Sequence, residues 1–324
     1  MGDAGISADA GCSGPVRIEA PFPGDLYLDG RFTGLRAPAE VPRWSGLRRV
    51  GVGSPSGGYF RAEVDAADAC RIQLRPEDRS AARSWRARYI TLHAAFARLP
   101  DTSTCTAALD DVDADRSFQD FERSVHLHFE PDSFHTMAWE IDRQEVRTPF
   151  EVRDQGGGFY AVDPADVAAL IADVVPGTLD TIVVFFRSAG PGCVIPGDYL
   201  GLSVPPSQAS HEAGFTSVKL EVEGSLDPVW TYLEANDPGV WIHEFLHTVA
   251  DQYYPGLGAT MPEPSADGSI VHAAEAYHYA APWMTWYSDL IAGRVVLPDG
   301  YGGITPELLL RCTLKDRVNL PGCR

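Results

Sequence analysis

The feature that most constrains this chain is an apolar helix that has to bury two histidines and a glutamate. Asp237-Pro238 predicts where this helix begins, because Asp is a favoured N-cap and Pro suits the first helical position. The helix should extend over residues 237–254, and it contains the pattern H-E-x-x-H at His243, Glu244 and His247. The surrounding apolar side chains are Val240, Trp241, Phe245, Leu246 and Val249. Burying imidazoles and a carboxylate without partners is costly, so a bound metal ion is the expected partner.

The spacing of the two histidines suits a single metal ion. Side chains at positions i and i+4 lie one turn apart on the same face of a helix, so His243 and His247 can reach the same ion. Neutral imidazole is a favoured ligand of Zn²⁺. Glu244 follows the first ligand and is placed to accept a proton from water as a general base. The sequence therefore predicts a catalytic zinc site.

This motif and its setting resemble the zincin metallopeptidases, closely over residues 237–254 and more loosely over about 84–324. The resemblance implies zinc-dependent hydrolysis of peptide bonds, with a peptide or protein as the substrate. It also implies a strand that runs along the cleft and binds extended substrate. The alternating stretch Phe215–Val222, just before the helix, is the candidate for that strand and is expected near a sheet edge.

A catalytic zinc needs three protein ligands and an open position, so a third ligand has to be found. The metzincin pattern would place Gly at 250 and His at 253, where this chain has Ala250 and Tyr253. A gluzincin-like arrangement takes a glutamate from a later helix, and Glu275 is the first choice. His272, three residues earlier on the same helical face, is the alternative ligand. Asp251, four residues past the second histidine, could orient an imidazole or serve as a ligand itself.

Peptide hydrolysis also calls for a donor that stabilises the oxyanion. Tyr277, His278, Tyr279 and Tyr287 are the candidates, and His278 and Tyr279 are the preferred pair. Two other functions remain open on the same motif. One is a surface binding protein whose zinc site is structural or inactive, and the other is a zinc hydrolase of non-peptide amides.

Residues 16–80 predict a small β domain after a flexible leader at residues 1–15. Short alternating runs, typical of strands, are separated by turn residues, and Asp29-Gly30 is a strong hairpin signal. The stretch over about residues 16–74 resembles a PEGA-type domain. The residues behind this resemblance are Pro23 to Gly30, Gly34, Gly46 to Val50, and Gly58-Tyr59. The resemblance implies a carrier or spacer module without catalysis.

Helices and strands mix after residue 81, so we expect an α+β fold in which a domain over 81–324 contains a mixed sheet. The continuous apolar run Thr181–Phe186 predicts a buried central strand. The spacing of apolar residues predicts helices over residues 84–99, 164–175 and 271–292. The alternation at residues 124–129 predicts a strand with His126 and His128 on one face.

The acidic balance excludes one class of partner. The net charge is −19, and residues 81–324 hold 16 Lys and Arg against 34 Asp and Glu. Nucleic-acid binding needs basic surface, so no nucleic-acid partner is expected. No run of about 18 apolar residues is present, and no transmembrane segment is predicted.

The six cysteines include no C-x-x-C pair, which favours disulfides and an extracytoplasmic compartment. Cys312 with Cys323 is the most local pairing. The N-terminus shows no export signal, although Ala10-Gly11-Cys12-Ser13 resembles the cleavage end of a lipoprotein signal and suggests lipid or surface attachment.

An acidic run raises the hypothesis of a second metal, Ca²⁺. Asp111, Asp113, Asp115 and Glu122 occupy positions 1, 3, 5 and 12 of an EF-hand loop. Arg116 occupies position 6, where the sharp turn of such a loop requires Gly.

Overall fold

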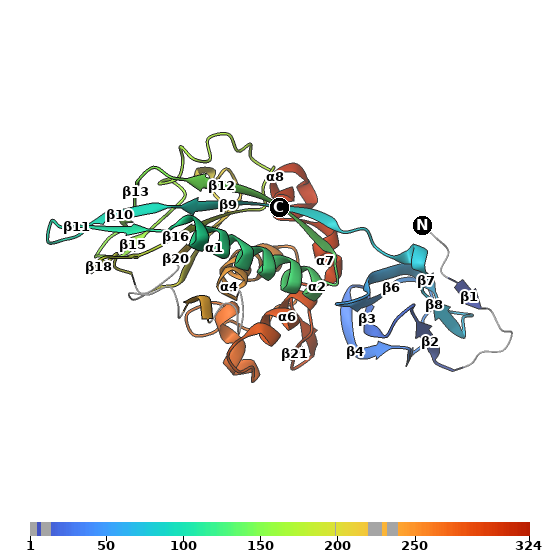
Figure 1. Ribbon diagram of the computed structural model, residues 1–324. Helices are drawn as coiled ribbons and strands as arrows, with labels where there is room; N and C mark the ends of the chain where they lie inside the picture. The colour runs from blue at the N-terminus through green and yellow to red at the C-terminus, as the bar shows by residue number, and fades with distance from the viewer. Residues whose placement is uncertain (1–4, 8–13, 198, 220–228, 232–238) are drawn as a thin grey trace.

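The computed structural model describes residues 5–7, 14–197, 199–219, 229–231 and 239–324. Alternating strands at the N-terminus form a β domain, and the rest of the chain forms a larger unit of helices and sheets (Figure 1). The α+β class is as predicted. None of the described helices is long and apolar enough to cross a membrane.

The β domain consists of two four-stranded sheets that share a hydrophobic core. One sheet has the order β1-β8-β2-β5 and the other β4-β3-β6-β7. The strands are β1 (Gly5–Ser7), β2 (Val16–Glu19), β3 (Gly24–Leu28), β4 (Arg31–Ala37), β5 (Ala39–Val41), β6 (Leu47–Ser54), β7 (Gly58–Asp65) and β8 (Arg71–Gln73). The predicted hairpin is present, with φ of 50° at Asp29 and 80° at Gly30. Residues 5–7, expected in a leader, pair with β8, whereas Cys12 lies outside the described residues.

The larger unit is built on a five-stranded sheet of order β12-β9-β16-β20-β19. Its strands are β12 (Met137–Val146), β9 (Arg83–Leu92), β16 (Thr181–Phe186), β20 (Gly214–Lys219) and β19 (Gly201–Val204). The first four are parallel, and β19 pairs antiparallel with β20 at the edge. Every residue of β16 is buried, which confirms the predicted central strand.

The prediction of a helix over residues 84–99 is wrong. The segment forms β9 and then β10 (Ala94–Arg98), because Trp85, Ala87 and Tyr89 are buried in alternation with more exposed residues. This period of two fits a strand. Residues 164–175, also predicted as a helix, form turns instead.

The predicted strand at residues 124–129 and the EF-hand loop are both replaced by helix. Helix α1 (Asp111–Arg123) continues through the π-helical turn η2 (Ser124–Phe129) into α2 (Glu130–Asp132). The Asp110 side chain accepts a hydrogen bond of 2.9 Å from the Asp113 backbone N–H and caps α1. Aspartates in a first turn are favoured by the helix dipole, so the acidic run begins a helix rather than a calcium loop.

The helix that carries H-E-x-x-H packs on the sheet through aromatic side chains. It comprises α4 (Gly239–Thr248), the π-helical turn η4 (Val249–Tyr253) and α5 (Tyr254–Gly256). Trp241 and Phe245 of α4 contact Phe129 and Trp139, with ring centroids 5.4–5.8 Å apart. Figure 1 shows α1 and α4 beneath the same part of the sheet. The predicted helix start at Asp237-Pro238 lies outside the described residues.

Shorter elements complete the larger unit and its termini. After α5 come the 3₁₀-helix η5 (Val271–Tyr277) and helix α6 (Met284–Ala292), within the zone predicted to be helical. The others are η1 (Pro76–Asp78), β11 (Thr104–Ala108), β13 (Phe150–Glu151), β14 (Arg153–Asp154), β15 (Tyr160–Ala161), β17 (Ala189–Gly190), β18 (Cys193–Val194), η3 (Gln208–Ser210), β21 (Val295–Leu297), β22 (Gly300–Gly302), α7 (Pro306–Arg311), α8 (Asp316–Asn319) and η6 (Pro321–Cys323).

The β domain docks against α6 and α7 through side chains. Tyr27 donates a hydrogen bond of 2.8 Å to the Ala292 carbonyl at the end of α6. Buried Glu307 of α7 accepts a hydrogen bond of 3.1 Å from the Tyr59 hydroxyl and pairs with two arginines of the β domain, Arg49 and Arg61. Side chains from both units therefore make up this interface.

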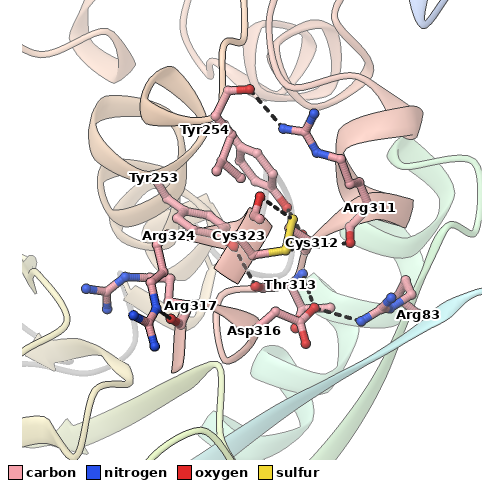
Figure 2. Close-up of a disulfide and its surroundings, with 12 residues drawn as sticks. Arg83, Tyr253, Tyr254, Arg311, Cys312, Thr313, Asp316, Arg317, Cys323 and Arg324 are labelled. Carbon is pink, nitrogen blue, oxygen red and sulfur yellow. Dashed lines mark hydrogen bonds and ion pairs between the residues drawn. A yellow bond between two sulfur atoms is a disulfide. The ribbon is translucent and has the colours of Figure 1, made fainter. Parts of the chain in front are cut away.

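The C-terminal segment is closed by a disulfide and lies against the end of the H-E-x-x-H helix (Figure 2). Cys312 and Cys323 form this bond, the most local pairing expected from the sequence. The hydroxyls of Tyr253 and Tyr254 donate hydrogen bonds of 2.8 Å to the carbonyls of Thr313 and Cys312. Cys105 and Cys193 form a second disulfide, and Cys70 is also disulfide-bonded.

Candidate metal centre

Three histidines converge at the end of α4, and they are the group of metal-ligand type found among the described residues. His243 and His247 lie one helical turn apart, and their Nε2 atoms are 3.1 Å apart. The Nε2 atom of His272, at the start of η5, is 3.2 Å from that of His243. The three ligand atoms all lie within 4.8 Å of one another.

Asp251 explains why His272, and not Glu275, joins the two helix histidines. One oxygen of Asp251 accepts hydrogen bonds from the backbone N–H of Ile270 (2.8 Å) and of Val271 (3.3 Å). These bonds fix the start of η5 beside the H-E-x-x-H helix, so the second residue of η5 faces the imidazoles. Glu275 lies one turn further on and is exposed, outside the histidine group. The structure thus places the alternative ligand, rather than the first choice, at the centre.

A hydrogen-bond partner orients each imidazole through its Nδ1 atom. His247 Nδ1 lies 2.7 Å from Asp251, and His272 Nδ1 lies 2.6 Å from Asp267. A carboxylate beside Nδ1 favours the tautomer with the proton there, which leaves Nε2 with a free lone pair. His243 Nδ1 lies 2.8 Å from the Tyr287 hydroxyl. Asp251 therefore orients an imidazole, one of the two roles predicted for it.

The donor set fits a tetrahedral metal ion. Nitrogens bound at about 2.0–2.1 Å to a tetrahedral zinc lie roughly 3.3 Å apart, close to the 3.1 and 3.2 Å measured between the Nε2 atoms. Three imidazoles leave one of four positions open, as a catalytic site requires. Two lone pairs that face one another are also stabilised by a cation between them.

No family model and no curated protein matches this chain. The chemistry of the site therefore has to be argued from its own residues.

Glu244 lies beside the histidines and is held in a nearly dry position. Its side chain is 6% exposed, and burial raises its pKa to about 7 against the opposing effects of His247 and of a hydrogen bond from the Ser203 backbone. Burial, followed by the neighbouring His247 and His272, lowers the pKa of His243 to about 3, so this imidazole is neutral and able to bind metal.

A cleft of about 810 Å³ contains the histidines and Glu244. Edge strand β19 and the residues just before it form one wall, and the turn leading into α6 forms another. The side chains and glycine that line these walls are Tyr199, Leu200, Gly201, Leu202, Pro282 and Trp283. The cleft is thus bounded by the half-buried edge strand β19 on one side and by Pro282 and Trp283 on the other.

Three of the four predicted oxyanion donors do not line this cleft. Tyr279 donates its hydroxyl to Asp289 (2.8 Å), Tyr277 accepts a hydrogen bond from the Glu263 backbone, and His278 is exposed with φ of 67°. Tyr287 lines the cleft and contacts His243. His278 and Tyr279, the preferred oxyanion donors, therefore lie outside the cleft, because the short turn after η5 leads away from the three histidines.

Sequence reasoning missed the edge strand and one orienting carboxylate. Strand β20 covers the described part of Phe215–Val222 but is internal, because β19 pairs on its outer side. Residues 220–222 lie outside the described chain. Asp267 had no motif to mark it. His126 contacts Glu130 on the helical segment and does not belong to the metal group.

Proposed function

We propose that this protein is a zinc-dependent hydrolase of peptide bonds, and that His243, His247 and His272 bind the zinc ion. The observation that carries the proposal is the convergence of three Nε2 atoms beside a buried carboxylate. A zinc ion in this position supplies Lewis-acid chemistry: it lowers the pKa of water and polarises a carbonyl. The resemblance to zincins, stated from the H-E-x-x-H helix, supports the same activity.

Glu244 serves in this proposal as the general base. Its carboxylate lies in the cleft with the histidines, where it can take a proton from the attacking water and pass it to the leaving amine. A pKa near 7 suits both halves of that transfer at neutral pH. Its burial keeps bulk water away from the proton during the transfer.

Strand β19 is the element on which we propose an extended peptide binds. Lys219 N–H donates to the Leu200 carbonyl at 2.8 Å, which sets the alternation of the antiparallel ladder. By that alternation Leu202 faces β20, whereas the backbone groups of Gly201 and Ser203 face away from it. The Ser203 N–H is already hydrogen-bonded to Glu244, so a peptide added at this edge would pair with the N–H and carbonyl of Gly201 and with the carbonyl of Ser203, as in other cases of strand addition.

Glutamine in place of Glu244 tests the proposed chemistry. Glu244→Gln keeps the size of the side chain but removes the base, so we expect peptide hydrolysis to fall by 10²-fold or more with about one zinc still bound. Peptide-library cleavage with and without a chelator, together with metal analysis, measures both. Stoichiometric zinc with no cleavage by the wild-type protein would favour the binding-protein alternative, and cleavage of amides alone would favour the non-peptide hydrolase.

A pair of variants tests the ligand set. His272→Ala should release zinc at concentrations that leave the wild-type protein loaded, because it removes one of three ligands. Glu275→Ala, on the same 3₁₀-helix, is the matched control and should keep the wild-type zinc affinity, measured by competition with a chelating dye. Loss of zinc in the Glu275 variant alone would contradict the histidine triad.

We also propose an extracytoplasmic location. The two disulfides between described cysteines favour an oxidising compartment. Attachment through the N-terminal region stays a prediction.

A further inference from the structure

Gly201 is the point at which β19 comes closest to Glu244. A Cβ atom added to Gly201 would lie 2.5 Å from Cγ, 2.6 Å from Oε1 and 2.8 Å from Cδ of Glu244. These separations are far below normal contact distances, so the base and any side chain at position 201 exclude each other. The backbone of Gly201 is outside the left-handed region, so the need for glycine here comes from space alone and holds while Glu244 keeps this position.

Two further contacts fix the same strand to the same helix. The Ser203 backbone hydrogen-bonds to the Glu244 carboxylate, and the Ser203 hydroxyl lies 2.9 Å from the Thr248 hydroxyl. Glu244 and Thr248 are one turn apart on α4. The carboxylate is thus enclosed between α4 and edge strand β19, which borders the cleft.

We propose that Gly201 is a positioning residue, whose missing side chain lets Glu244 lie flat against β19 beside the histidine triad. The proposal rests on the proposed hydrolase function and adds a structural requirement to it. The strand that would pair with an extended substrate also determines where the base sits. Strand β19 would therefore position both the carbonyl of the substrate and the Glu244 carboxylate that accepts the proton.

A double-mutant cycle in thermal stability tests the steric part without any activity. Gly201→Ala should lower Tm in the wild-type background, because the new methyl group displaces Glu244. In the Glu244→Ala background the three clashing atoms are gone, so Gly201→Ala should leave Tm unchanged or raise it. Gly256→Ala, at a glycine with open space around it, is the matched control. An equal loss of Tm in both backgrounds would overturn the proposal.

Kinetics of the zinc-loaded protein test the positioning role. Gly201→Ala should lower kcat by at least tenfold while zinc content stays at the wild-type level, and the shorter base in Gly201→Ala/Glu244→Asp should recover part of that loss. Glu244→Asp alone should be slower than wild type. An unchanged kcat in Gly201→Ala, or no recovery with the shorter base, contradicts the role. An inactive wild-type protein refutes the hydrolase function instead, and the stability cycle still reports on the contact.

Discussion

The β domain and the C-terminal segment are both attached to the unit that carries the three histidines, but by different means. The β domain is held in part through ion pairs whose arginines stay about 40% exposed, namely Arg49 and Arg61 on Glu307, and through a less exposed pair between Arg294 and Asp25. The C-terminal segment is closed by a disulfide and uses Lys315 to pair with fully buried Asp180 on the sheet side. Exposed pairs are weakened by salt and water, whereas a covalent loop with buried partners is not.

The two attachments also reach different parts of the site. The C-terminal segment accepts hydrogen bonds from Tyr253 and Tyr254, which directly follow the helix of His243 and His247. The β domain contacts the far end of α6, whose earlier turn carries Tyr287. We therefore expect the C-terminal segment to influence zinc affinity more than the β domain does. The role of the β domain as a carrier or spacer stays a prediction.

Removal of the C-terminal disulfide should give the largest loss of unfolding free energy. Cys312→Ala with Cys323→Ala frees a loop of sequence separation 11 and should lower the free energy of unfolding by about 3 kcal/mol, with a measurable loss of zinc affinity. Urea unfolding and chelator competition measure these. Cys105→Ala with Cys193→Ala is the control, because that disulfide belongs to the other core of the unit and should leave zinc affinity unchanged. Equal zinc affinities in both double variants would contradict the comparison.

Breaking the ion pairs of the β domain should have a somewhat smaller effect. Glu307→Gln leaves two arginines without their carboxylate, and we expect a loss of about 2–3 kcal/mol in the free energy of unfolding, limited by the exposure of those arginines. The loss should shrink in 0.5 M salt, while zinc affinity stays at the wild-type value. A loss of unfolding free energy that does not change with salt would show that packing, rather than charge, accounts for the stabilisation.

The contact between α2 and α6, where Ser288 donates a hydrogen bond to Asp132, should carry a pH dependence. Burial raises the pKa of Asp132 to about 6, opposed by the Ser288 hydrogen bond and by Arg294, while Asp289 adds to the rise. The folded protein then binds a proton that the unfolded chain loses near pH 4, so stability falls as pH rises from about 4 to 6. Relative to Asp132→Asn, the wild-type protein should lose about 2 kcal/mol of unfolding free energy across this interval. Urea unfolding at each pH measures this loss. A constant difference between the two proteins would contradict this.

The smallest effect is expected from a single hydroxyl. Tyr254→Phe removes the hydrogen bond to the Cys312 carbonyl inside a packed site and should cost about 1 kcal/mol of unfolding free energy. A slight loss of zinc affinity should accompany it. Tyr27→Phe removes the comparable bond of the β domain to Ala292, and the same stability loss without a zinc effect would sharpen the comparison.

Structural features that depend only on neighbouring residues could be predicted from the sequence. The Asp29-Gly30 hairpin, strand β16 and the pair of histidines on α4 each depend on neighbouring residues, and the structure confirms them. The helix predicted over residues 84–99 is wrong because the apolar side chains there match a helical spacing only in part, and the pairing of β9 with β12 and β16 decides the outcome.

The parts of the site that the sequence did not determine depend on contacts between distant residues. The choice of His272 over Glu275 follows from hydrogen bonds that Asp251 makes to the Ile270 and Val271 backbone. The edge position of β19 follows from the order of strands, which sequence spacing does not encode. Histidine identity was therefore predictable, whereas the third ligand and the cleft wall were not.

Asp251 has a consequence for how the triad is assembled. His247 and His272 are 25 residues apart, and bringing the ends of such a loop together costs on the order of 3 kcal/mol in chain entropy. Because the same carboxylate holds His247 and the backbone just before His272, the protein closes this loop with its own hydrogen bonds. In the proposed function the zinc ion therefore does not have to supply the free energy of closing this loop, and its binding is a docking event rather than a folding one.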